Sequence, residues 1–132
     1  MNHISALITD IKQSKNISIV SFEAHGHSMK MMALGLAEPI HVGSTVILGL
    51  KASNIAIAKS FSGDISISNR LHVSIEKINY GKLLCTVFFR FGEHLLESII
   101  TRDSAESMGL HVKDDIIALI KSSELSIIEV LS

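Results

Sequence analysis

A threonine and a serine three residues apart, Thr101 and Ser104, are side chains that could bind an anion. Thr101 precedes residues 103–108, which predict a short helix that Gly109 ends in a left-handed conformation. The Thr101 hydroxyl can cap the free backbone N–H groups of that helix, and Ser104 brings a second hydroxyl to the same place. Free N–H groups at a helix start attract anions. Capping alone is the simpler explanation of Thr101, so the pair needs independent support.

That support comes from a lysine followed by small hydroxyl residues, the run Lys-Ser-Ser at 121–123. A tetrahedral dianion needs a cation, several N–H and O–H donors and no nearby carboxylate, and this run offers the cation and the donors. A lysine at the end of a strand is usually only solvated. The first half of the chain, however, repeats the arrangement as Lys-Ala-Ser at 51–53. The recurrence favours a binding role for both lysines.

The two lysines recur because the chain consists of two related halves. Residues 40–59 align with residues 110–129 at an offset of seventy, and six of these twenty positions are identical. Residues 2–8 align with residues 69–75 at an offset of sixty-seven, so the first half is three residues shorter in its middle. We therefore predict two repeats of one architecture.

Each repeat has a mostly β pattern. In the second repeat, apolar and polar residues alternate over 71–75, and a turn is predicted at 79–82. Further strands are predicted at 83–91, 94–100, 116–121 and 125–131. Five short strands with a helix before the fourth are typical of a small barrel that resembles an OB-fold. The predicted fold class is all-β, with two tandem five-stranded OB-like β-barrels that each have a short helix.

The predicted domains follow the repeats: 1–59 for the first, divergent repeat, 60–65 for a linker and 66–132 for the second repeat. A unit of roughly sixty residues buries too little surface to be comfortably stable alone. We therefore expect the two units to pack together and the chain to form a homo-oligomer.

The composition argues against several function classes. The formal net charge is -1, and the chain has five Phe, one Tyr and no Trp, so a basic, aromatic face for nucleic acid is not expected. No apolar run approaches the roughly 20 residues that span a bilayer. The first twelve residues lack the features of a signal peptide. The single cysteine, Cys85, excludes an intramolecular disulfide and fits a reducing compartment, so a cytoplasmic location is expected.

Other residues that could do chemistry have simpler explanations. His25 and His27 could bind a transition metal, but two histidines at a hairpin turn are more often solvated. Glu93 and Glu97 have no partner base or nucleophile, so they are not credible catalytic acids. Cys85 lies on an alternating apolar strand and is most simply a core residue. An enzymatic function is therefore not predicted.

Taken together, these segments resemble the Mop domain of the molbindins, which belongs to the wider TOBE group. The likeness is carried by Ile-Thr-x-x-Ser-x-x-x-x-Gly-Leu at 100–110 and Ala-Leu-Ile-Lys-Ser-Ser at 118–123. Ser-Ile-Ser-Asn-Arg-Leu at 66–71 is similar to the family's opening segment, Ser-Ala-Arg-Asn-Gln-Leu. The resemblance covers nearly all of residues 66–131 and is weaker over residues 1–60.

The resemblance implies an OB-like fold that binds molybdate or tungstate between barrels. Family members with tandem repeats typically assemble as trimers, so the expected partner is further copies of the chain. The oxyanion-binding residues carried over by position are Ser66, Thr101, Ser104, Lys121 and Ser122 in the second repeat, and Lys51 and Ala52 in the first.

Two departures from the family pattern affect this expectation. The family's arginine in the opening segment falls at Ser68, with Arg70 as a candidate replacement. The first repeat lacks the Thr-x-x-Ser helix start and instead reads Met-Met-Ala-Leu-Gly-Leu-Ala-Glu-Pro at 31–39. We expect the sites that rely on the helix of the second repeat to persist and the others to be lost or altered.

The function expected from these residues is the binding of molybdate or tungstate for intracellular molybdenum storage, buffering or delivery, without catalysis. Two alternatives stay open at this point. One is an OB-type nucleic-acid binder, against which the charge and the aromatic content argue. The other is a module for assembly or partner binding whose oxyanion sites have decayed, against which the retention of Thr101, Ser104 and Lys121 argues.

Overall fold

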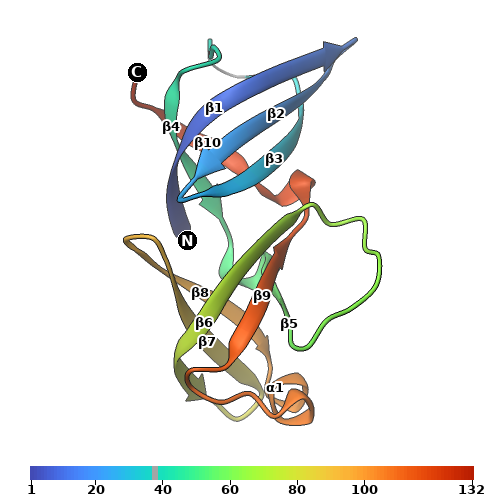
Figure 1. The fold of residues 1–132 in the computed structure, drawn as a ribbon, viewed down its shortest axis with the longest axis vertical. Helices are drawn as coiled ribbons and strands as arrows, with labels where there is room; N and C mark the ends of the chain where they lie inside the picture. Colours follow the sequence, from blue (N-terminus) through green and yellow to red (C-terminus); the bar gives the residue numbers. More distant parts are fainter. Residues whose placement is uncertain (37–38) are drawn as a thin grey trace.

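Ten strands form two five-stranded antiparallel sheets, which lie one above the other along the long axis of the molecule (Figure 1). The computed structural model describes residues 1–36 and 39–132. Each sheet curls into an OB-like barrel, so the predicted all-β fold with two five-stranded barrels is confirmed. Among the described residues, no helix has the length and apolar character needed to cross a membrane.

The first barrel has the strand order β10-β4-β1-β2-β3. Its strands are β1 (Asn2–Ser14), β2 (Ile17–Ala24), β3 (His27–Leu34), β4 (Thr45–Leu50) and β10 (Ser126–Val130). Alternation along β1 turns its apolar side chains inward, because successive side chains of a strand point to opposite faces.

The second barrel has the strand order β5-β9-β6-β7-β8. Its strands are β5 (Ala56–Ala58), β6 (Asn69–Tyr80), β7 (Leu84–Phe91), β8 (His94–Thr101) and β9 (Asp115–Ile120). The helical elements of the chain are α1 (Arg102–Met108) and the short 3₁₀ turns η1 (Ala52–Asn54) and η2 (Ser122–Glu124).

The two repeats exchange their last strands. β5, from the first repeat, pairs with β9 of the second barrel, and β10, from the second repeat, pairs with β4 of the first barrel (Figure 1). The barrels and the sequence repeats therefore differ by one strand each. The boundaries 1–59, 60–65 and 66–132 describe the duplication in the sequence, and their meaning as folding units stays a prediction.

Matching irregularities confirm the internal duplication. The register of β1 shifts between Ile8 and Asp10, and that of β6 shifts between Ile75 and Lys77, sixty-seven residues later. At the start of each bulge the strand makes the same backbone bond to the residue just before the fourth strand of its repeat. The amide of Ile8 donates to the carbonyl of Ser44 at 2.9 Å. The amide of Ile75 donates to the carbonyl of Asp114, also at 2.9 Å.

A single apolar cluster extends through both barrels. Ile4 and Phe22 of the first barrel belong to the same cluster as Leu71, Phe89 and Ile120 of the second. All five side chains are essentially inaccessible to solvent. Burying each of them contributes about 1.5–3 kcal/mol of transfer free energy, so this shared core makes the two barrels one folded body.

Two buried asparagines also join the barrels. Asn2 on β1 donates to the carbonyl of Glu97 on β8 at 2.8 Å, and the Glu97 amide donates back to Asn2 at 3.0 Å. Asn69 on β6 donates to the carbonyl of Lys30 on β3 at 2.8 Å, and the Lys30 amide donates back at 2.7 Å. These reciprocal pairs relate equivalent positions and fix the start of each repeat to the third strand of the other.

The helix predicted over 103–108 is confirmed as α1, with Thr101 as its N-cap and Gly109 in the left-handed region at φ 59°. Ala105 lies on the buried face of α1 and belongs to the same apolar cluster as Cys85 and Leu110. Cys85 is the core residue that the sequence predicted, and burial of its thiol raises its pKa, although the charge of Arg102 acts in the opposite direction.

The first repeat differs from the predicted pattern, because among the described residues its only helical element is the 3₁₀ turn η1. β3 continues to Leu34, and Gly35 turns the chain at φ 75°. Of the segment 31–39, which was expected to lack a helix start, residues 37 and 38 lie outside the described part of the structure. The prediction of a short helix in each barrel therefore holds as an α-helix only for the second repeat.

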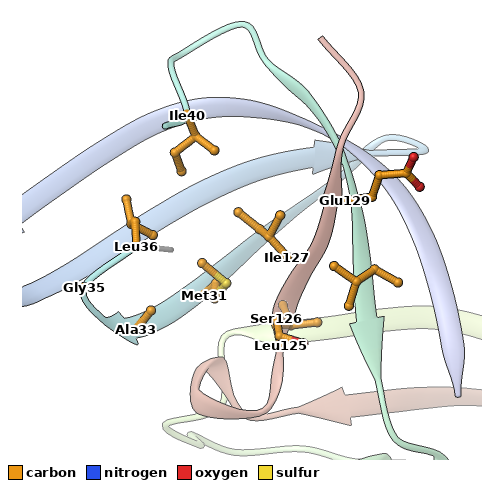
Figure 2. A pocket seen from close by; sticks show the side chains of 10 residues that line it. Met31, Ala33, Gly35, Leu36, Ile40, Leu125, Ser126, Ile127 and Glu129 are labelled. Atoms are coloured by element: carbon orange, nitrogen blue, oxygen red, sulfur yellow. The ribbon is translucent and has the colours of Figure 1, made fainter. Parts of the chain in front are cut away.

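The first barrel has an apolar seam between its two edge strands, β3 and β10. A cavity of about 180 Å³ lies there (Figure 2). Met31 and Ala33 of β3 line one side, and Leu125 and Ile127 line the other. β3 and β10 are the two ends of the hydrogen-bonded strand order, so the residues along this seam face each other through side chains and not through a shared ladder of backbone bonds.

Candidate oxyanion site

Three of the residues expected to bind an oxyanion lie together in one surface hollow. The hollow has a volume of about 290 Å³ and lies where η2 packs against β3. It is lined by three serines, two lysines and three apolar side chains: Ser66, Ser122, Ser123, Lys30, Lys121, Ile19, Met32 and Ile67. The structure thus brings Ser66, Lys121 and Ser122 together from two segments more than fifty residues apart.

The turn that presents Lys121 follows directly from the end of β9. Lys121 is still extended, with φ -65° and ψ 144°, and its carbonyl accepts a bond from the Glu124 amide at 2.9 Å. Leu125, on the other side of this 3₁₀ turn, is buried in the core. The turn is therefore anchored at both ends, and Ser122 is held beside the lysine.

Arg70 positions the segment that carries Ser66. Its guanidinium donates to the carbonyl of Ile67 through Nε and to the carbonyl of Ile65 through a terminal nitrogen, each at 2.8 Å. The Ser68 hydroxyl lies 3.4 Å from that of Ser122. Arg70 thus fastens the segment, and it is absent from the lining of the hollow. A role for it as the replacement cation gains no support from this geometry.

The charges around the hollow favour an anion. Lys30 and Lys121 are its two charged residues, and no carboxylate lines it. The nearest acidic residue along the chain, Glu124, accepts a hydrogen bond from Asn54 Nδ2 at 2.8 Å. Lys121 and Ser66 are exposed and Ser122 is half-buried, so the hollow is open to solvent on one side.

Thr101 and Ser104 lie elsewhere in the chain. The Thr101 hydroxyl donates to Ser104 Oγ at 2.8 Å and accepts from the Ser104 amide at 3.1 Å, as expected of a helix cap. α1 lies at one end of β9 and Lys121 at the other (Figure 1). A strand of six residues spans about 20 Å, so one chain does not bring Thr101 to the hollow.

Lys51 and Ala52 occupy the equivalent turn after β4. Lys51 is exposed, and Ala52 is largely buried and offers no hydroxyl. This turn, η1, packs against β8 as η2 packs against β3. β8 carries Glu97 at the position where β3 carries Lys30. The third strand that packs against each lysine turn therefore carries an opposite charge at this equivalent position.

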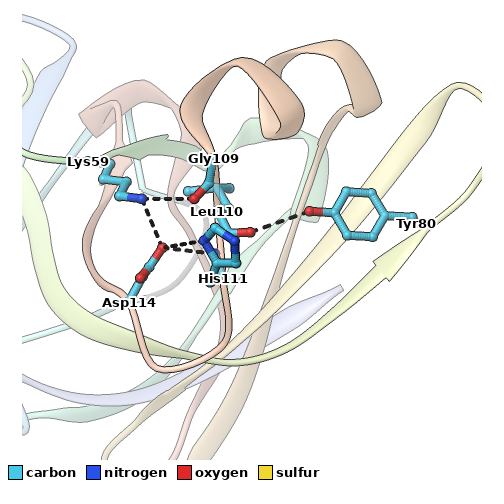
Figure 3. Close-up of polar contacts among 6 residues, drawn as sticks. All are labelled: Lys59, Tyr80, Gly109, Leu110, His111 and Asp114. Atoms are coloured by element: carbon cyan, nitrogen blue, oxygen red, sulfur yellow. Dashed lines mark hydrogen bonds and ion pairs between the residues drawn. The ribbon is translucent and has the colours of Figure 1, made fainter.

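A polar network fixes the far end of β9. Lys59 Nζ contacts the Gly109 carbonyl at 2.9 Å and Asp114 Oδ2 at 3.0 Å (Figure 3). Asp114 also accepts from the His111 amide at 2.8 Å. This backbone bond first, and Lys59 second, lower the pKa of the Asp114 carboxyl. The Tyr80 hydroxyl donates to the Leu110 carbonyl at 3.4 Å, which ties the end of α1 to β6.

The histidines at the hairpin turns contact aromatic rings. The His25 ring lies 5.1 Å from that of Phe91 and 5.2 Å from that of His94, and the His27 ring lies 5.1 Å from that of Phe91. Within residues 1–36 and 39–132, no three His, Cys, Asp or Glu side chains gather in a way that could hold a metal ion.

Residues 65–127, which make up nearly all of the second repeat, match the model of the TOBE domain. The fold and this match together define a two-barrel protein whose second repeat is similar to the TOBE domain. This confirms the resemblance to the TOBE group seen in residues 66–131.

The fold is shared with one molybdate-binding protein of known structure. The cytoplasmic molybdate-binding protein ModG, solved with molybdate bound, superposes with a TM-score of 0.88 at 19% identity, over 96% of this chain and 94% of ModG. The resemblance to tandem-repeat molbindins is therefore confirmed at the level of the fold.

The chain is also similar to the molybdenum import ATP-binding protein ModC of Brucella abortus and of Brucella suis. Each is 30% identical over 105 residues, which cover 79% of this chain. The chain spans 28% of the length of these relatives.

Sequence reasoning missed Lys30, the second lysine of the hollow. It comes from the first repeat, whereas the other polar lining residues come from the second. Alternation along β3 predicts only that Lys30 points outward. The asparagines that bond to Lys30 and Glu97 are visible in the sequence, because Asn2 and Asn69 are identical residues at matching positions of the two repeats. That signal predicts a shared structural role without naming the partner.

Proposed function

We propose that this chain binds molybdate at the hollow of Ser66, Lys121 and Ser122, without catalysis. The observation that carries the proposal is that these three residues, singled out in the sequence, line one hollow together with a second lysine, Lys30, and no carboxylate. The relation to TOBE proteins supports it, because that domain is a binding module. Tungstate, a dianion of the same geometry, is the proposed alternative ligand.

The proposed mechanism is equilibrium capture. A tetrahedral dianion exchanges bound water for the hydroxyls of the serines and for the charge of Lys121, and charge-assisted hydrogen bonds of this kind are stronger than neutral ones. An oxyanion of the wrong size would leave donors unpaired, which costs free energy and provides selectivity. Neither step requires a nucleophile or a general base.

The open side of the hollow supports a site shared between copies of the chain. We propose a homo-oligomer, a trimer, in which Thr101 and Ser104 of one copy complete the hollow of another. Exposed apolar side chains next to α1 favour such contacts, since Leu83 is 81% and Leu84 is 55% exposed. Sedimentation velocity tests this assembly, and a monomer in solution with molybdate present would refute it.

The proposed biological role is molybdenum storage, buffering or delivery in the cytoplasm. The likeness to ModG, described as a cytoplasmic molybdate-binding protein, supports both the ligand and the location. The likeness to ModC, named for molybdenum import, supports a place in molybdenum handling.

Isothermal titration with molybdate tests the proposed function directly. We expect saturable binding of molybdate or tungstate, and none of sulfate or phosphate at the same ionic strength. Lys121→Gln removes the charge but keeps a flexible polar side chain, and it should weaken binding at least tenfold, about 1.4 kcal/mol, because the dianion loses one of the two lysine charges of the hollow.

The matched control is Lys113→Gln, which removes an exposed lysine at the opposite end of β9. It should bind like the wild type. Absence of heat with both molybdate and tungstate would refute the proposed function, and equal loss in the two variants would refute the assignment of the hollow.

A further inference from the structure

Lys30 and Glu97 occupy equivalent positions with opposite charges. They stand sixty-seven residues apart, on β3 and β8, which are the third strands of their repeats. The backbone of each is bonded in both directions to the side chain of a buried asparagine, Asn69 for Lys30 and Asn2 for Glu97. Their equivalence is therefore a property of the fold as well as of the sequence alignment.

Each asparagine also links its partner to one of the lysine turns. Asn69 pairs with Ile120, the residue before Lys121. Asn2 pairs with Leu50, the residue before Lys51. Asn69 thus connects the strand end before Lys121 to the backbone of Lys30. In the same way, Asn2 connects the strand end before Lys51 to the backbone of Glu97. In the first case the structure places both lysines in the lining of one hollow.

We propose that this pair of residues decides which lysine turn holds an oxyanion. Lys30 is the second cation of the hollow at Lys121, and Glu97 prevents the turn at Lys51 from binding a dianion. Each chain then has one working site of this kind, formed by residues of both repeats. This inference rests on the proposed function, since it concerns the same oxyanion site.

The electrostatic magnitudes support a decisive effect. A unit charge about 6 Å from a dianion in a water-like dielectric changes the affinity roughly tenfold, and more where the dielectric is lower. A lysine raises the affinity by this factor and a glutamate lowers it. Opposite charges at such a distance from two otherwise equal sites make a combined difference of about a hundredfold in affinity, which separates a filled site from an empty one at a given concentration.

The first experiment compares Lys30→Gln and Lys30→Arg with the wild type by equilibrium dialysis against molybdate. We expect about tenfold weaker binding for Lys30→Gln and recovery for Lys30→Arg, because arginine restores the charge. The loss should shrink in 0.5 M salt, where charges are screened over about 4 Å. Both substitutions leave the backbone bonds to Asn69 in place, so the barrels should remain joined, and Lys113→Gln serves again as the control.

The outcomes separate this inference from the proposed function. A wild-type chain that takes up neither molybdate nor tungstate overturns both. Binding that is lost in Lys121→Gln but unchanged in Lys30→Gln overturns this inference and leaves the proposed function standing.

A charge reversal at Glu97 tests the second half of the inference. Glu97→Lys should increase the molybdate bound per chain, and adding Lys51→Gln to that variant should remove the increase. Uptake that does not change in Glu97→Lys would show that the glutamate is not what disables this turn.

Discussion

At the scale of single residues, the asparagine at the start of each repeat controls how the barrels are joined. Asn69 is completely buried, and its amide group satisfies both backbone groups of Lys30. A buried backbone group that loses its partner costs about 1–3 kcal/mol. The asparagines therefore hold the third strands in place, and they do so at the same point of the fold where Lys30 enters the hollow.

Asn69→Ala should lower the free energy of unfolding by about 2–4 kcal/mol, because it leaves the Lys30 amide and carbonyl unpaired. Urea unfolding followed by circular dichroism measures this loss. Asn79→Ala, an exposed position on the same strand β6, is the control and should change stability by less than about 0.5 kcal/mol. Similar unfolding midpoints for both variants would contradict the assigned role of Asn69.

At the scale of elements, the exchange of last strands distinguishes the fold from two separate barrels. β10 pairs with β4, and its Ile127 packs against the core of the first barrel, although β10 belongs to the second repeat. The stability of the first barrel therefore depends on residues far away in the sequence.

Ile127→Asp should destabilise the first barrel by about 2–4 kcal/mol, because a carboxylate would replace an apolar side chain in the seam. Hydrogen exchange should show faster exchange of the β4 amides in this variant. Ile128→Asp, at a 44% exposed neighbouring position, should have a smaller effect. Protection of β4 that does not change in Ile127→Asp would be inconsistent with the exchanged arrangement.

The strands could be predicted from the sequence, whereas their exchange could not. Alternation reports which face of a strand is buried, and it located the strands of both repeats. β5 and β10 carry isoleucine at the matching positions 57 and 127, so either strand could complete either barrel. The choice depends on connections and on packing between the barrels, which local patterns do not report.

The candidate site, like the fold, could be predicted only in part from the sequence. Lys121, Ser122 and Ser66 could be found because their types recur in a known motif. Lys30 could not be found, because its place in the hollow depends on one barrel packing against the other.

At the scale of the whole molecule, two hairpins bring histidines together where the barrels meet. His25, in the β2–β3 turn, lies so close to Gly92, in the β7–β8 turn, that a Cβ atom there would meet its ring. The same ring lies 5.2 Å from that of His94, and His94 Nε2 accepts a bond from the Ser5 amide at 3.3 Å. That bond requires a neutral His94.

These surroundings make the packing of the barrels sensitive to acid. Burial, and then the charge of His25, lower the pKa of His94 below its ordinary value of 6.5, with a smaller contribution from His3 in the same direction and an opposing one from Glu93. The unfolded chain therefore binds a proton at His94 more readily than the folded chain does. The contribution of neutral His94 to the free energy of unfolding is fully present above pH 6.5. It is lost as the pH falls below that value toward the lower pKa of His94 in the folded state.

The midpoint temperature of unfolding should consequently fall between pH 7.5 and pH 5.5. His94→Gln removes the titrating ring, so its midpoint should change less over the same range. His72→Gln, an exposed histidine on β6, is the control and should retain the wild-type pH dependence. Scanning calorimetry at several pH values measures the three slopes. A slope for His94→Gln as steep as that of the wild type would mean that protonation elsewhere in the chain weakens the fold in acid.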